Sequence, residues 1–208
     1  METSQATLLI VEDVPDTLEL LDVTLKFKGY RVVTATNGLD ALKLIEQERP
    51  ALVITDILMP KMDGFSLVHR LRIDPTTRGL PVIFLSATYV APADKEFAAA
   101  IGATRFIEKP IEIESLLRAV NDLLARGAPP SPALIGDAEF YEGYRQRLKE
   151  KLEEKVAQIT RTEGMLDALS DAEKPAFRKS LQQMIAERDE IQYLLNKIYE
   201  QTGRDEKG

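Results

Sequence analysis

The sequence predicts an α/β fold, a doubly wound parallel sheet of five strands covered by helices, followed by an all-α antiparallel helical hairpin. Up to residue 126, short runs rich in β-branched apolar residues alternate with longer amphipathic segments, as in a parallel sheet flanked by helices. Residues 127–136 hold three prolines and two glycines, which cannot continue a helix. Beyond them, apolar residues recur at steps of three and four, which is the helical period.

The first unit is predicted to alternate strands and helices as (βα)5 and to span residues 1–126. Apolar runs bounded by turn-forming or capping residues place the strands at 7–11, 31–35, 52–55, 82–86 and 104–107. Amphipathic segments place the helices at 15–28, 38–47, 65–72, 92–100 and 112–125. Pro15 and Pro92 open two of these helices, and proline suits a first helical turn because its missing N–H would be unpaired there. Residues 127–136 then form a linker.

The second unit is predicted to be a helical hairpin at 137–203, with a disordered tail at 204–208. Its first helix carries an apolar stripe of Phe140, Tyr144, Leu148, Leu152, Val156 and Ile159. The returning helix carries a second stripe of Phe177, Leu181, Met184, Ile191, Leu195 and Ile198. A capping box of Ser170 and Glu173, followed by Pro175, places the reversal between them. Sustained heptad-like spacing favours a homodimer through these helices, or docking of a downstream protein.

The composition excludes several classes of protein. The 208 residues contain no cysteine, which removes disulfides, thiol nucleophiles and zinc-thiolate sites. Residues 1–7 are polar and give no export signal, and no apolar run approaches the roughly 20 residues that span a bilayer. The net charge of −7 repels phosphate backbones. We therefore expect a cytoplasmic protein that binds no membrane and for which nucleic acid is not the favoured partner.

Polar side chains follow the predicted strands at the points where they end. Glu12 and Asp13 follow the first strand, the third runs into Asp56, Ser86 ends the fourth, and Lys109 follows the fifth. Because the carboxyl ends of parallel strands meet at one edge of a sheet, these side chains are expected to converge. The result would be an anionic pocket of hard oxygen ligands, which suits Mg²⁺ better than zinc or copper.

On these residues the sequence resembles the receiver domains of two-component response regulators, the CheY-like superfamily with a flavodoxin-like fold. The resemblance covers residues 7–125. It rests on four blocks in the family's order and spacing: Leu-Leu-Ile-Val-Glu-Asp at 8–13, Asp-Ile-Leu-Met-Pro-Lys-Met-Asp-Gly at 56–64, Phe-Leu-Ser-Ala at 84–87 and Phe-Ile-Glu-Lys-Pro at 106–110. It implies a phosphorelay protein whose partner is a sensor histidine kinase. The roughly 80 residues after 126 hold no glycine-rich phosphate loop and no acidic metal motif, so we expect no enzyme with its own catalytic output domain.

The resemblance also implies the chemistry of the site. Asp56 would be the nucleophile and phosphoacceptor, attacking a phosphohistidine of the kinase. Glu12, Asp13 and Asp56 would hold Mg²⁺ together with the backbone carbonyl of Leu58. Lys109, followed by the family's cis peptide bond to proline, would pair first with Asp56 and later with a phosphoryl oxygen.

A switch is implied by the same family. Ser86 would turn its hydroxyl to the phosphoryl group, and Phe106 would rotate inward into the vacated space. A packed core role for Phe106 is the alternative. His69, the single histidine of the chain, is expected at a surface or edge without a catalytic role.

Two hypotheses remain for the function of the second unit. Residues 127–208 carry 13 Lys and Arg against 16 Asp and Glu, a net charge of −3, and no histidine, which excludes a histidine phosphotransfer bundle. We favour an interaction protein in which phosphorylation changes dimerisation or docking. The alternative is a transcriptional regulator whose short helical domain binds DNA through local basic patches at 145–151 or 178–179.

Overall fold

The computed structural model describes residues 6–126, 135–166 and 174–202. The chain divides into two compact units between Gly136 and Asp137, which are described one at a time. The predicted tail, the capping box of Ser170 and Glu173 and nearly all of the predicted linker lie outside the described residues.

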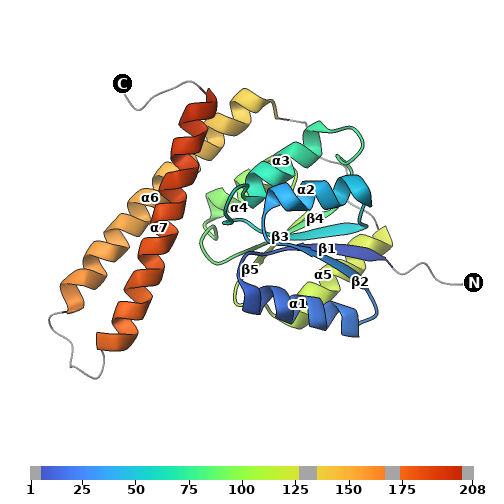
Figure 1. The fold of residues 1–208 in the computed structure, drawn as a ribbon. Helices are drawn as coiled ribbons and strands as arrows, with labels where there is room; N and C mark the ends of the chain where they lie inside the picture. The colour runs from blue at the N-terminus through green and yellow to red at the C-terminus, as the bar shows by residue number, and fades with distance from the viewer. Residues whose placement is uncertain (1–5, 127–134, 167–173, 203–208) are drawn as a thin grey trace, which may run out of the picture. The chain divides into compact units, whose positions relative to one another are not determined.

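The first unit is built on a five-stranded sheet in which every pairing is parallel (Figure 1). Its strands are β1 (Thr7–Val11), β2 (Arg31–Ala35), β3 (Leu52–Asp56), β4 (Val82–Ser86) and β5 (Arg105–Glu108). Their spatial order is β2-β1-β3-β4-β5, so the direction of winding reverses between β1 and β3. Ligands of open parallel sheets bind at the carboxyl ends of strands beside such a reversal.

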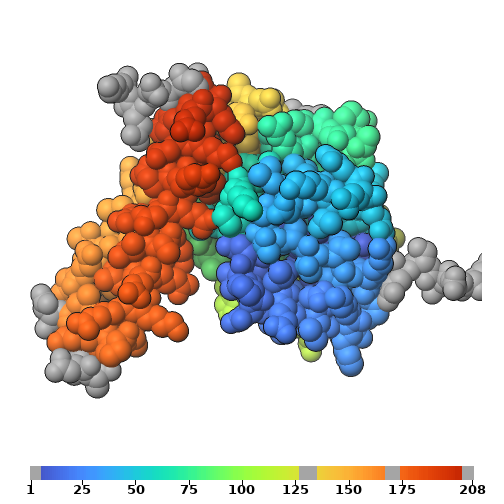
Figure 2. All heavy atoms as spheres, in the orientation of Figure 1, coloured from blue at the N-terminus to red at the C-terminus, as the bar shows by residue number. Residues whose placement is uncertain are grey.

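Helices cover both faces of the sheet, as the ribbon in Figure 1 and the same view with all heavy atoms in Figure 2 show. They are α1 (Pro15–Phe27), α2 (Gly38–Gln47), α3 (Gly64–Ile73), α4 (Pro92–Ala100) and α5 (Ile113–Arg126). On one face, leucines of α1 and α5 pack with β1, β3 and β4 in a buried apolar cluster. On the other, Phe65 of α3 meets Phe84 of β4 edge to face, with ring centroids 5.3 Å apart.

Side chains at the helix starts explain where these helices begin. The Asn37 side chain accepts a hydrogen bond from the Asp40 N–H at 3.0 Å and caps α2. Asp63 caps α3 in the same way, accepting from the Ser66 N–H at 2.9 Å. Proline stands in the first turn of α1 and of α4, as predicted.

The predicted α/β fold is confirmed, and most predicted element ends differ from the observed ones by one residue or none. β3 includes Asp56, and β5 begins and ends one residue later than predicted. The surface or edge position expected for His69 is wrong, because this residue is 3% exposed. The reason is that α3 is enclosed over most of its circumference, with Leu67, Val68 and Leu71 buried on either side of the histidine.

The second unit consists, over its described residues, of α6 (Asp137–Leu166) and α7 (Lys174–Thr202), which lie side by side (Figure 1). They run antiparallel, because contacts that advance along α6 retreat along α7: Lys149 with Tyr199, Lys155 with Glu187, and Thr162 with Met184. On α7 the predicted stripe is confirmed, with Ile191, Leu195 and Ile198 buried and its other members half-buried. Within the described ranges, no helix has the length and apolarity to cross a membrane.

The stripe predicted on α6 is wrong at one residue. Val156 was expected to face inward but is 45% exposed. Lys155 takes the inward position, and its ammonium pairs with Glu187 of α7 at 2.8 Å. A lysine can occupy a helix seam because its stem is apolar and its charge is neutralised by the opposite carboxylate.

Gly64 is required by a close approach of two chain segments at the end of β3. Its N–H donates to the Ile57 carbonyl at 2.8 Å, which folds the loop after Asp56 back onto the strand. A Cβ at this position would stand 2.2 Å from the Asp56 carbonyl oxygen. The loop can therefore close only with glycine there.

We predict that Gly64→Ala lowers the free energy of unfolding by about 1–3 kcal/mol, because the new methyl group overpacks against backbone atoms. Urea denaturation measures the change. Gly79→Ala is the matched control, since a Cβ at that position meets nothing within 4 Å. Equal stabilities of the two variants would contradict the close approach.

Candidate functional site

Asp56 lies at the carboxyl end of β3, beside the reversal of winding, and is 8% exposed. One carboxylate oxygen, Oδ1, accepts a hydrogen bond from the Ile57 N–H at 2.5 Å. The other, Oδ2, forms an ion pair with the ammonium of Lys109. The sequence did not predict the Ile57 N–H as a donor, because a pattern of side chains does not show the direction of a backbone N–H.

Glu12 and Asp13 follow β1, the strand paired with β3, and face Asp56. Glu12 is fully buried, and its Oε2 accepts from the Lys109 ammonium at 2.8 Å. Its Oε1 accepts from the Val14 N–H at 3.3 Å. Carboxylate oxygens of Glu12, Asp13 and Asp56 all lie within 4.8 Å of one another. Four of the predicted site residues, Lys109 among them, are thus brought together.

Burial and mutual repulsion make the ionised cluster unfavourable. Burial raises the pKa of Glu12 to about 7, and the charge of Asp56 adds to this effect, while Lys109 opposes it. Burial likewise raises the pKa of Asp13, again with help from Asp56. Uncompensated negative charge is therefore concentrated at this edge.

The carboxylates of Glu12, Asp13 and Asp56 suit a divalent cation that prefers oxygen ligands. Three carboxylates within bridging distance supply oxygen atoms and excess negative charge, which are what Mg²⁺ binds. The half-buried Asp13 leaves the cluster open to solvent on one side, so that water can complete the coordination. The role predicted for the Leu58 carbonyl stays a prediction.

Lys109 follows β5, and its peptide bond to Pro110 is cis, as expected. Burial lowers the pKa of Lys109, but the charges of Asp56 and Glu12 and their hydrogen bonds more than offset burial, so the pKa is raised. The side chain therefore keeps its positive charge and faces both carboxylates.

The two predicted switch residues are engaged in contacts of their own. Ser86 is buried at the end of β4, and its hydroxyl oxygen accepts from the N–H groups of Thr88 at 3.2 Å and Tyr89 at 3.0 Å. Phe106 is half-buried on β5, beneath the ammonium of Lys95. Their movement on phosphorylation stays a prediction.

The response regulator receiver domain family matches residues 8–121. The chain belongs to this family. Its receiver domain is the α/β unit that carries the acidic cluster and Lys109. The helices α6 and α7 lie beyond the matched residues.

Known proteins resemble the receiver domain but differ in total length. Protein PilH of Pseudomonas aeruginosa is 37% identical over 120 residues, which cover 58% of this chain and 98% of PilH. The transcriptional regulatory protein GlrR of Escherichia coli is 38% identical over 130 residues, which cover 62% of this chain but 28% of GlrR.

One solved structure that is similar to this chain contains a metal ion. The receiver domain of a Pseudomonas aeruginosa sensor histidine kinase, with a magnesium ion coordinated in its active-site cleft, is similar with a TM-score of 0.54 and 26% identity, over 59% of this chain and 99% of that one.

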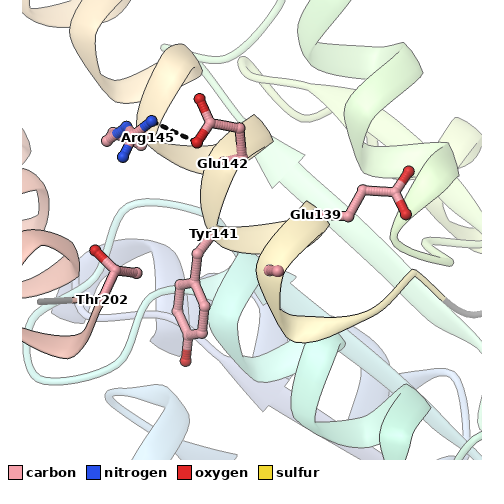
Figure 3. A pocket seen from close by; sticks show the side chains of 6 residues that line it. Glu139, Tyr141, Glu142, Arg145 and Thr202 are labelled. Atoms are coloured by element: carbon pink, nitrogen blue, oxygen red, sulfur yellow. Dashed lines mark hydrogen bonds and ion pairs between the residues drawn. The ribbon is translucent and has the colours of Figure 1, made fainter. Parts of the chain in front are cut away.

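A separate pocket of about 510 Å³ lies in the second unit between the start of α6 and the end of α7. It is lined by Ala138, Glu139, Tyr141, Glu142, Arg145 and Thr202. Figure 3 shows Glu142 pointing to Arg145, with which it forms an ion pair, and Glu139 pointing away from them. The charged side chains drawn there are either paired with each other or turned outward. They therefore do not converge on one point of the pocket, as the groups of a catalytic site would.

We predict that Asp13→Asn weakens Mg²⁺ binding by about ten-fold or more, because one of three carboxylate charges is removed. Isothermal titration calorimetry with MgCl2 measures the affinity. Asp74→Asn is the control, since that carboxylate accepts hydrogen bonds from Thr76 in the loop after α3. Unchanged affinity in Asp13→Asn would remove this residue from the metal site.

Proposed function

We propose that this response regulator accepts a phosphoryl group on Asp56 from a phosphohistidine of a sensor kinase, and that phosphorylation changes the association of its C-terminal helices. The observation that carries the proposal is the Asp56 carboxylate, buried among two further carboxylates and ion-paired to Lys109. This arrangement supports phosphoryl transfer because it combines a nucleophile with positive charge for the arriving oxygens.

In the transfer, an Asp56 carboxylate oxygen forms a bond to phosphorus as the bond from phosphorus to the histidine nitrogen breaks. The electron pair of that bond returns to the imidazole. The Ile57 N–H holds the Asp56 side chain in place, and Lys109 moves from the carboxylate to a phosphoryl oxygen. Mg²⁺, when bound to Glu12, Asp13 and Asp56, would neutralise charge between the phosphoryl group and the carboxylates.

An exposed apolar stripe on α1 supports a protein as the phosphoryl donor. Leu20, Val23 and Phe27 stand on one face of the helix, and Phe27 is 85% exposed. The helix begins at Pro15, close behind Asp13, so the stripe leads away from the site. Exposed apolar surface of this kind typically contacts another protein.

The second unit supports no catalytic output. Its described residues form two helices, and residues 127–208 as a whole carry a net charge of −3, whereas a nucleic-acid-binding unit normally carries a basic stripe. We therefore propose that the chain is not an enzyme beyond its own phosphorylation and dephosphorylation, and we rank the DNA-binding alternative below the interaction protein.

We predict that acetyl phosphate with Mg²⁺ labels the wild-type chain and leaves Asp56→Asn unlabelled, because an amide cannot act as the nucleophile. Intact-mass spectrometry detects the added phosphoryl group. Asp40→Asn, on the exposed surface of α2, serves as the control and should be labelled like the wild type. A labelled Asp56→Asn chain would defeat the proposal.

Self-association of the hairpin is the proposed output. Two helices alone bury little apolar surface between them. In α6, the described residues after Ile159 that face α7 are only half-buried. Val156 and Met165 of α6 and Tyr193 of α7 remain exposed apolar residues on the outside of the pair. A second copy of the hairpin would cover such residues in a four-helix bundle.

We predict that the chain forms a dimer and that Val156→Asp raises its dissociation constant by about ten-fold or more, because a charge would be buried in the interface. Sedimentation velocity over a concentration series measures this constant. Gln158→Asp adds the same charge at an exposed polar position of the same helix and should leave it unchanged. A monomeric wild type, or equal behaviour of the two variants, would count against the hairpin as the dimer interface.

A further inference from the structure

Three side chains form a small cluster on the surface of α4 and β5. The ammonium of Lys95, on α4, lies 5.8 Å from the centroid of the Phe106 ring. The same ammonium forms an ion pair with the Glu108 carboxylate. Phe106 and Glu108 are two residues apart on β5, so their side chains leave the strand on the same face. Lys95 thus bridges two neighbours on that face.

The two interactions of Lys95 reinforce each other. The ion pair with Glu108 restricts where the long lysine side chain places its charge. That charge then lies over the ring of Phe106, where a cation is attracted by the negative face of an aromatic group. Both partners belong to one strand, so Lys95 also ties α4 to β5.

Phe106 lies on β5, which pairs with β4, the strand that ends at Ser86. Ser86 is buried, and its hydroxyl oxygen accepts hydrogen bonds from Thr88 and Tyr89 in the loop after β4. An inward rotation of Phe106 would break the contact with Lys95 but would not break the ion pair with Glu108. The ring contact is therefore present in one state of the proposed switch and absent in the other.

We propose that Lys95 is a positioning residue that holds Phe106 outward and thereby opposes the change that follows phosphorylation. The proposal rests on the proposed phosphorylation of Asp56 and on the switch of Ser86 and Phe106 predicted from the sequence. A contact made in only one of two states shifts the equilibrium toward that state, and any ligand that favours the other state binds more weakly as a result. Lys95 therefore weakens the binding of a phosphoryl group or of its mimic.

The size of the effect follows from the exposure of the cluster. The side chains of Lys95 and Glu108 are 42% and 54% exposed, so solvent screens both charges. Cation–aromatic contacts at exposed sites have modest strength. Lys95→Met keeps the length and apolar stem of the side chain and removes its charge. We expect it to lower the half-saturating concentration of beryllofluoride by about three-fold to five-fold.

Titration of the full chain with beryllofluoride at constant Mg²⁺, followed by amide NMR, measures this concentration. Lys95→Arg should restore the wild-type value, because guanidinium also pairs with carboxylates and lies over aromatic rings. Lys43→Met is the matched control: it removes an exposed lysine that pairs with Asp40 on α2, and it should leave the value unchanged.

A double-mutant cycle separates a role through Phe106 from a general effect of charge. In a Phe106→Leu background the ring is absent, so adding Lys95→Met should change the half-saturating concentration by less than about two-fold. An equal shift in both backgrounds would overturn the proposal, as would no shift from Lys95→Met in the wild-type background. A wild type that binds no beryllofluoride at all would instead refute the proposed function itself, and the role of Lys95 with it.

Discussion

The ion pairs of Lys109 with Asp56 and Glu12 are the interaction on which the receiver site depends. Three carboxylates meet where strands β1 and β3 end, and the lysine neutralises only part of their charge. Burial and the negative charge that Lys109 does not neutralise raise the pKa values of Glu12 and Asp13, because both disfavour the ionised forms of these carboxyl groups. Under the proposed function, the same excess charge that destabilises the unliganded site would attract a divalent cation, and the lysine that stabilises it would receive phosphoryl oxygens.

The scaffold keeps this cluster intact by packing around it closely. Asp56 ends a central strand, which pairs with β1 on one side and with β4 on the other. The loop that follows folds back to Gly64 against the Asp56 carbonyl, and the Lys109 N–H donates to the Ser86 carbonyl at 2.9 Å. Glu12 is fully buried and cannot turn away into water. The charges are therefore held close together by the fold, although they repel one another.

Much of this site could be predicted because strand ends are visible in a sequence. Apolar runs mark β1, β3 and β5, and polar residues directly after them must share an edge in a parallel sheet, which places Glu12, Asp56 and Lys109 together. What could not be predicted depends on neighbours distant in the chain. His69 is buried because α3 is enclosed, and Lys155 replaces Val156 in the helix seam because Glu187 stands opposite. In the sequence alone, Lys95 resembles an ordinary solvated lysine, because its contacts with Phe106 and Glu108 arise only where β5 lies beside α4.

Under the proposed switch, the contrast between two lysines would explain how the domain can be both stable and switchable. Lys109 is largely enclosed by two carboxylates, so removing either partner would leave buried charge and destabilise the site strongly. Lys95 binds its partners at the surface, where screening by solvent limits each contact to a small free energy. A two-state element responds to a ligand only when the free energy separating its states is no larger than the difference in the ligand's affinity for them. Weak surface contacts around Phe106 satisfy this condition, and strong buried contacts there would not.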